Sequence, residues 1–240
     1  MPFLICGQAS LENRLQATRW SELVARISCL PARSRLYSSP LRPILARSPH
    51  LSNRLACHTM SRKYKFHNEE GLYFVSFATV YWVDVFVRDH YCWELVESLD
   101  FCRRNKGMAI YAWCIMPNHV HLIYRAKQRN PGDLLRDLKT YTSKRIQALI
   151  AENPRESKKD WMLWLMKRAG MKNSNVKNRQ FWQQHNHPIE LWSPKVIDQK
   201  VDYIHRNPVE AGFVTEPHHW KYSSAIDYSG GKGLLEICFV

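Results

Sequence analysis

Residues 109–125 read AIYAWCIMPNHVHLIYR, and the centre of the predicted sheet lies in them. It contains two apolar runs, 109–116 and 119–125, which are separated by a Pro117-Asn118 pair that is typical of a turn. Both runs are rich in β-branched and aromatic side chains, which favour strands over helices. We therefore predict two neighbouring strands joined by a short turn.

The second predicted strand carries two histidines with one residue between them, His119-Val120-His121. Because successive side chains of a strand point to opposite faces, the two imidazoles are predicted to share one face, with Val120 on the other. Two adjacent imidazoles are natural ligands for a divalent metal ion. The same spacing also fits a polar edge on a solvated strand, so the motif alone leaves both interpretations open.

Elements before and after this pair extend the pattern. A strand is predicted over 72–80 and a helix over 89–105, while a long amphipathic helix begins near Gly132-Asp133. An extended segment over 181–192 and a helix over 194–207 follow. The order strand, helix, strand, strand, helix, strand, helix predicts an α+β fold, a ferredoxin-like split βαβ sheet with an added C-terminal helix.

The last helix has signals at both of its ends. Ser193 suits an N-cap and Pro194 the first turn, whereas Pro208 is expected to end the helix at Asn207. Within the helix, Tyr203 and Asn207 are four residues apart and are therefore predicted to lie on one face. A tyrosine on an amphipathic helix also fits simple core packing.

A tyrosine hydroxyl, with an ordinary pKa of about 10, needs assistance to attack a phosphodiester at neutral pH. A divalent ion that polarises the phosphate gives this assistance, and the Asn207 amide oxygen could serve as a third ligand beside the two histidines. Tyr141 is an alternative nucleophile, but it is predicted on an apolar helix face with Leu138 and Leu149 and has no amide one turn later. We therefore favour Tyr203.

The composition indicates a globular protein with a polyanionic partner. The 240 residues are 45% hydrophobic, and 35 basic against 21 acidic residues give a net charge of +14. Such a surface gains free energy by neutralising phosphates. No apolar run reaches the roughly 18 residues that a membrane span requires. Seven cysteines without a C-x-x-C pair fit a reduced, cytoplasmic protein, with Cys92, Cys102 and Cys114 as small apolar residues.

The chain divides into two parts of different composition. Residues 1–59 contain eight arginines, no lysine and two acidic residues, and are expected to be a basic, disordered or non-native extension. A leader, a basic tail or translated upstream DNA would each fit, and we favour the last, with Met60 as the true start. Residues 60–240 keep 27 basic and 19 acidic residues, a net charge of +8. They are predicted to form one domain with a basic helical insertion at about 153–180.

Three passages resemble a known family. They are YAWCIMPNHVHLI (111–123), FWQQHNHPIEL (181–191) and VDYIHRNPVEAGFV (201–214), the last followed by HWKYSSAIDY (219–228). Together they resemble the HUH single-tyrosine transposases, and in particular the REP-associated tyrosine transposases of bacterial chromosomes. The resemblance covers nearly all of the chain after Met60.

The resemblance implies a metal-dependent enzyme that cuts and rejoins single-stranded DNA near a hairpin or inverted repeat. By it, His119 and His121 hold a divalent Mg²⁺ or Mn²⁺ ion, Asn207 is the third ligand, and Tyr203, on a catalytic C-terminal helix, forms a 5′-phosphotyrosine. It also implies a bacterial, cytoplasmic and nucleoid-associated protein. The oligomeric state, monomer or homodimer, stays open.

Basic residues in these elements are candidate DNA contacts. They are Arg62, Lys63, Arg136, Lys139, Lys144, Lys200 and Arg206. Trp161 and Trp164 could stack on bases, although their helical spacing favours packing. His187 lies where many relatives have an aromatic and acidic cluster, so its role is open.

Two other functions compete with the transposase. The first is a catalytically inactive, domesticated protein that keeps the fold and binds single-stranded DNA. The second is a metal-dependent hydrolase of another phosphodiester, because two histidines and an amide do not dictate the acceptor. A protein-linked DNA adduct would distinguish the transposase from both.

Overall fold

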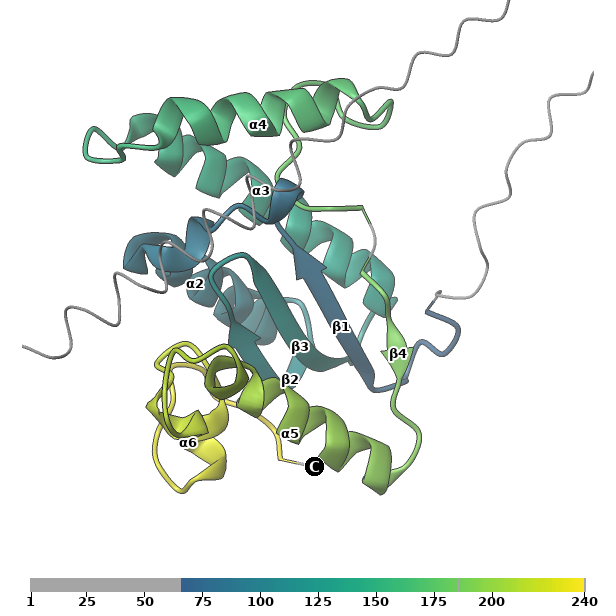
Figure 1. Cartoon of the computed structure of the whole chain (residues 1–240). Coiled ribbons are helices and arrows are strands. Elements are labelled where there is room, and N and C mark those ends of the chain that lie inside the picture. The colour runs from purple at the N-terminus through teal and green to yellow at the C-terminus, as the bar shows by residue number, and fades with distance from the viewer. Residues whose placement is uncertain (1–65, 185, 240) are drawn as a thin grey trace, which may run out of the picture. The chain divides into compact units, whose positions relative to one another are not determined.

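A computed structural model of the chain describes residues 66–184 and 186–239 (Figure 1). The predicted N-terminal extension over 1–59 lies outside these residues, as do the candidate DNA contacts Arg62 and Lys63. Among the described residues, no helix is both long and apolar enough to cross a membrane.

The centre of the fold is a four-stranded antiparallel sheet. Its strands are β1 (Tyr73–Ala78), β2 (Met108–Ile115), β3 (His119–Ala126) and the short β4 (Ile189–Glu190), arranged in the order β2-β3-β1-β4. Read from β4, this is the 4-1-3-2 order of a split βαβ sheet. The predicted ferredoxin-like α+β class is confirmed.

Helices cover both faces of the sheet (Figure 1). On one face, α2 (Asp89–Asn105) and α3 (Pro131–Glu152) pack on the main apolar core. On the other face, α5 (Pro194–Glu210) buries Val201 and Ile204 in a smaller core. The even-odd alternation of strand side chains therefore sends each strand residue either to the α2–α3 side or to the α5 side.

The sequence between α3 and β4 adds one further helix, α4 (Lys159–Met171), which packs on α3 rather than on the sheet (Figure 1). Only one side of α4 is covered, and that side buries Met162 and Met166. Trp161 and Trp164 lie off this stripe and are 51% and 53% exposed, so the expectation that they pack is wrong.

Most of the predicted element bounds agree with the structure. The helix over 89–105 is as predicted, and β2 and β3 lie within one residue of the predicted strands. The extended segment 181–192 contains little regular strand: it pairs at Trp182, in an isolated bridge with Thr79, and in β4. Two further hydrogen bonds join this segment to β1: Gln183 N–H donates to the Ala78 carbonyl at 2.8 Å, and Ser76 N–H donates to the Asn186 carbonyl at 3.2 Å.

The prediction that Pro208 ends the last helix is wrong, because α5 continues to Glu210. Pro208 is buried, so packing of its ring offsets the loss of one helical hydrogen bond in the final turn. The helix closes one turn later, where the N–H groups of Ala211 and Phe213 donate to the carbonyl oxygens of Asn207 and Pro208 at 3.0 and 2.9 Å.

The remaining elements are short. They are the 3-10 turns η1 (Val80–Trp82), η2 (Val85–Val87) and η3 (Pro217–His219), and the helix α6 (Ala225–Tyr228). The segment before α6 is fixed to β2, since Ile115 N–H donates to the Tyr222 carbonyl at 2.9 Å and Ser224 N–H to the Trp113 carbonyl at 3.0 Å. The C-terminal part of the chain is thus attached to the sheet edge next to α5.

Candidate active site

The two histidines of β3 lie side by side on the face that α5 covers. Their ring centroids are 4.7 Å apart, and across the sheet they pair with Ala78 and Ser76 of β1. Both neighbours are small, which leaves space above the strand for the imidazoles. His121 is nearly buried, at 3% exposure, whereas His119 lies toward the strand end and is partly open.

Tyr203 comes to this pair from α5. Its ring centroid lies 5.3 Å from that of His121, and Phe74 of β1 packs edge-on against the tyrosine at 6.0 Å. The phenol is nonetheless 42% exposed, so it borders the site without being closed into the core. The strand β3 (His119–Ala126) and the helix α5 (Pro194–Glu210) thus bring together residues that are far apart in the sequence.

Asn207 lies one helical turn after Tyr203 and next to both imidazoles. Its amide nitrogen donates to the Tyr203 carbonyl at 2.9 Å, which leaves the amide oxygen for another partner. The nearby amide raises the pKa of His119 and of His121, although burial has the larger, opposite effect on both. The side chain makes no direct hydrogen bond with His121, however.

Burial outweighs the effect of the amide and keeps both histidines neutral. Desolvation lowers the pKa of His119. For His121, burial first and then the charge of His119 lower the pKa to about 3. An imidazole must be deprotonated at one nitrogen to bind a metal ion, and both rings meet this condition near pH 7.

The donor set fits a divalent ion. Both ring nitrogens of His121 are buried without a hydrogen-bond partner, and an unsatisfied buried polar atom costs about 1–3 kcal/mol. A bound ion would satisfy one of them. No group of three or more His, Cys, Asp or Glu side chains that could hold a metal occurs in the described part of the chain. Asn207, one helical turn after Tyr203, is the candidate for a third ligand through its amide oxygen.

A chain of two hydrogen bonds orients His119. Its Nδ1 donates to Asn118 Oδ1 at 2.8 Å, and Asn118 Nδ2 donates to Asp84 Oδ1 at 2.7 Å. With the proton on Nδ1, the lone pair of His119 is on Nε2, where a metal ion can take it. The sequence reading missed Asp84 and Asn118, although Asn118 adjoins the histidine motif.

A second feature that the sequence reading missed is an aromatic turn beside His119. In η1, Tyr81 and Trp82 have φ angles of 56° and 55°, a left-handed conformation that is strained for bulky residues. Trp82 is 58% exposed, and its ring lies 5.8 Å from that of His119. The turn is held by Thr79, whose carbonyl accepts from Trp82 N–H and whose N–H donates to the Asn118 carbonyl.

Of the predicted DNA contacts, Lys200 lies at this site. Its ammonium is 4.8 Å from the Phe74 ring centroid and 5.2 Å from that of Tyr203. Arg206 is exposed on the same helix, 3.9 Å from Glu210, which is a weak surface pair. A phosphate next to Tyr203 would be within reach of the positive potential of Lys200.

The three other predicted contacts among the described residues lie on α3, which covers the opposite face of the sheet. Arg136 pairs with Asp133 at 2.7 Å, Lys144 is exposed, and Lys139 is partly buried and hydrogen-bonded. The expectation for Tyr141 is wrong: it is 57% exposed and not part of an apolar face. His187 is exposed, with a φ of 41°, and its role stays a prediction.

Comparison with known proteins shows what this part of the chain is similar to. Residues 72–167, which include β1 to β3 and both histidines, match the family described as "Transposase IS200 like". This region is therefore similar to the IS200-like transposases. The IS200-like match ends before α5, so Tyr203 and Asn207 lie outside it.

Two relatives agree with the IS200-like match. A Haemophilus influenzae protein named as a REP-associated tyrosine transposase is 28% identical over 113 residues, which are 47% of this chain and 56% of that protein. This chain thus spans just over half of the relative's length. A solved structure of a REP-associated tyrosine transposase bound to a REP hairpin superposes with a TM-score of 0.51 at 18% identity, over 75% of this chain and 92% of that one. The structural match supports the fold, and the resemblance to this group is confirmed.

Proposed function

We propose that the protein is a DNA strand transferase of the single-tyrosine type, which acts on single-stranded DNA that contains a hairpin. The main observation behind the proposal is that α5 packs beside β3. The ring centroids of Tyr203 and His121 are 5.3 Å apart. The IS200-like match and the hairpin in the related solved structure support it. Because the DNA is chromosomal in this account, the protein acts in the bacterial cytoplasm.

The reaction requires one exchange of bonds at phosphorus. The Tyr203 phenol oxygen attacks the scissile phosphate, the P–O3′ bond breaks, and the phenol proton is passed on so that the leaving oxygen becomes a 3′-hydroxyl. The 5′-phosphate stays on Tyr203 as an ester, and attack by another 3′-hydroxyl reverses the step. The energy of the bond is kept in the adduct, so no ATP is needed.

The residues of the candidate site would each have a distinct role in this reaction. His119, His121 and Asn207 would hold Mg²⁺ or Mn²⁺, which when bound stabilises negative charge on the phosphate oxygens. Asn118 keeps His119 in the ligand tautomer. Lys200 adds positive charge beside the phenol at 5.2 Å from its ring. Phe74 limits the approach of water from the β1 side.

The direct test uses a labelled hairpin oligonucleotide with Mn²⁺ or Mg²⁺, read on a denaturing gel. The parent protein should form a covalent adduct that depends on the metal, and Tyr203→Phe should form none. Tyr141→Phe removes an exposed phenol on the other side of the sheet and should leave the adduct unchanged. Equal adduct from the parent and from Tyr203→Phe would overturn the assignment.

The same experiment separates the competing functions. An inactive, domesticated binding protein would retain the oligonucleotide without an adduct under any metal. A hydrolase would release cleaved product with no protein-linked species. The exposed position of Tyr203 next to neutral imidazoles favours the covalent route over both.

A further inference from the structure

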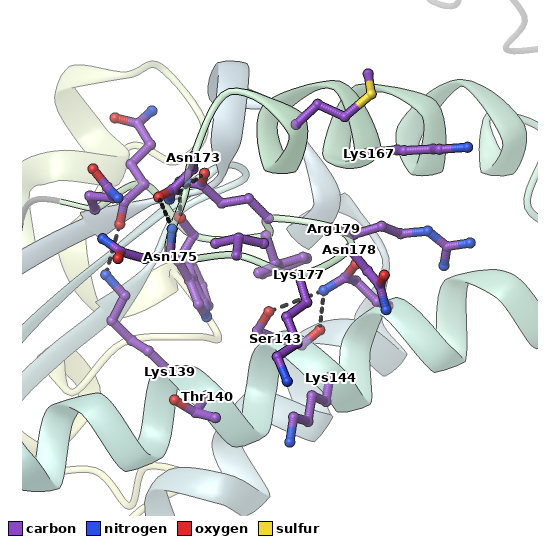
Figure 2. Close-up of a pocket in the computed structure, with 18 of the residues that line it drawn as sticks. Lys139, Thr140, Ser143, Lys144, Lys167, Asn173, Asn175, Lys177, Asn178 and Arg179 are labelled. Carbon is purple, nitrogen blue, oxygen red and sulfur yellow. Dashed lines mark hydrogen bonds between the residues drawn. The ribbon is translucent and has the colours of Figure 1, made fainter.

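A large groove lies between α3 and the loop that follows α4 (Figure 2). One wall is α3 and the other is formed by the end of α4 and residues 173, 175–184 and 186. The groove encloses about 1290 Å³, which exceeds the roughly 300–1,000 Å³ of pockets for small molecules. Its size favours a segment of a polymer over a metabolite.

The charge of the groove is entirely positive. Six cationic residues and no carboxylate line it, namely Arg136, Lys139, Lys144, Lys167, Lys177 and Arg179. Arg136 is paired with Asp133, and Lys139 is hydrogen-bonded to the wall. The other four make no ion pair with any described residue. Clustered cations without partners repel one another, and a polyanion relieves that repulsion.

Amide side chains accompany the cations. Figure 2 shows Asn175 and Asn178 in the loop across from Lys144 on α3. Neither amide makes a side-chain hydrogen bond within the described residues, whereas the neighbouring Asn173 donates to Gln180 at 3.0 Å. An amide offers a donor and an acceptor together, which matches the edges of nucleobases. The groove thus combines groups for phosphates with groups for bases.

The walls of the groove are fixed in place. Gln180 N–H donates to the Met166 carbonyl of α4 at 2.9 Å, and the Asn178 carbonyl approaches Gly170 so closely that a Cβ there would collide with it. From the α3 side, the Lys139 ammonium donates to the Gln183 carbonyl at 2.9 Å. The loop therefore needs little ordering to receive a ligand, which lowers the entropic cost of binding.

One wall of the groove is hydrogen-bonded to β1, the strand that pairs with the histidine-bearing β3. Gln183 N–H donates to the Ala78 carbonyl at 2.8 Å, and Ser76 N–H donates to the Asn186 carbonyl at 3.2 Å. Ala78 and Ser76 are the β1 residues that pair with the two histidines. A flexible strand that leaves the groove would pass the sheet edge outside β4 and Gln183, which lie beside β1, to reach the phenol.

We infer that the groove binds a single-stranded nucleic-acid segment that flanks the cleaved bond. Lys144, Lys177 and Arg179 contact its phosphates, and Asn175 and Asn178 contact its bases. A single strand fits because its base edges are open to the amides and because it bends easily around the sheet edge. This inference rests on the proposed function. It adds the position at which the protein binds the single-stranded DNA next to the cleaved bond.

The test compares two double variants that each remove two exposed positive charges. Lys177→Gln/Arg179→Gln alters the groove, and Arg125→Gln/Lys127→Gln alters the exposed end of β3 and its loop. Binding of a labelled hairpin with a single-stranded flank is followed by fluorescence anisotropy across a salt titration. The groove variant should bind roughly 20-fold more weakly at 0.1 M salt, and its log–log salt slope should fall by about 1.4, the value for two phosphates of a single strand. The control variant should match the parent.

Several outcomes would overturn the inference. Equal affinity of the groove variant and the parent would remove the groove from DNA binding while the adduct of the parent keeps the proposed function intact. Equal weakening in both variants would show a general charge effect. Equally strong, groove-dependent binding to anionic lipid vesicles would show a surface for any polyanion. An unchanged salt slope with a changed base preference in Asn175→Ala/Asn178→Ala would support the contacts to bases, and an unchanged preference would refute them.

Discussion

Asn118 is the residue whose role is most sharply defined by hydrogen bonds. Its side chain accepts a hydrogen bond from His119 at 2.8 Å and donates one to Asp84 at 2.7 Å. The Asp84 carboxylate therefore fixes the orientation of Asn118, which in turn orients the candidate metal ligand His119. Outer partners of metal-bound histidines set the tautomer and the ring orientation. A residue that never touches the ion can therefore control how tightly the ion is held.

We expect Asn118→Ala to weaken Mn²⁺ binding about 10- to 100-fold, because outer partners of metal ligands contribute on this scale. Calorimetric titration of the protein with Mn²⁺ measures the effect directly. Asp84→Asn should weaken binding less, since Asn118 can still accept from His119. Unchanged Mn²⁺ affinity in Asn118→Ala would show that the chain of hydrogen bonds has no influence on the site.

Trp82 gives a second prediction at this scale. Its exposed ring next to His119 is suited to stack on an unpaired base, and stacking contributes about 1–3 kcal/mol per base. Trp82→Ala should lower adduct formation at limiting DNA about tenfold or more, and Trp82→Phe should restore much of it. Trp161→Ala removes a similarly exposed tryptophan from α4 and is the matched control. Equal losses in the alanine variants would contradict a local role.

The sequence predicted those residues of the site that follow a local period. His119 and His121 share a face because strands alternate, and Tyr203 and Asn207 share a face because helices repeat near four residues. Asp84 and Trp82 follow no such period. They reach the site through two 3-10 turns whose path depends on hydrogen bonds to distant residues, which a sequence pattern does not contain.

Among the elements, α5 has two functional faces. Tyr203 and Asn207 face the histidines, while His205 points to the C-terminal segment and lies 2.8 Å from Ser224 Oγ. Ser224 in turn accepts from Trp113 N–H of β2 at 2.9 Å. The position of the nucleophile therefore depends on contacts that the opposite side of its helix makes with the sheet edge.

Burial lowers the pKa of His205 to about 4, from 6.5 in an unfolded chain. The unfolded state therefore takes up a proton at a higher pH than the folded state, and stability falls as pH drops from 6.5 toward 4. Between pH 7 and pH 4 this residue should account for about 3 kcal/mol of the loss. Urea unfolding of His205→Gln, which keeps a polar partner for Ser224, should show a loss smaller by that amount. Equal losses in parent and variant would contradict the assignment.

Element bounds show where sequence patterns fail. The bounds of α2 agree because its apolar period, buried from Tyr91 to Cys102, ends at the cations Arg103 and Arg104. Pro208 misled because its buried ring stabilises one more turn, and Trp161 misled because, among the described elements, α4 packs mainly on α3 and leaves its other side open. In both cases a tertiary contact decides the outcome. Local sequence preference predicted the helix α5 correctly but placed its end too early, and it predicted a helix at Trp161 but the wrong side of it as buried.

At the scale of the whole molecule, the cations proposed to contact DNA lie at two separate sites among the described residues. Net charge predicted a polyanionic partner, but it did not show that one set of cations lines the groove on α3 and that another, Lys200, lies beside Tyr203. These sites lie on opposite faces of the sheet, and the strand β1 connects them. A single strand of DNA that engages both must pass the sheet edge.

A bound ion would also join parts of the molecule that contact one another over a small area. Its ligands come from β3 and α5, and the core between them is the smaller of the two. Binding to the folded state alone adds about 2.7 kcal/mol at an ion concentration 100 times the Kd, which for a domain of this size raises Tm by about 5–10 °C. Thermal unfolding of the parent with Mn²⁺ and with EDTA should show this difference. The variant His121→Ala/Asn207→Ala lacks two of the ligands and should unfold at one temperature in both solutions. A shift of the same size in this variant would mean that the ion binds elsewhere and that β3 and α5 do not hold it.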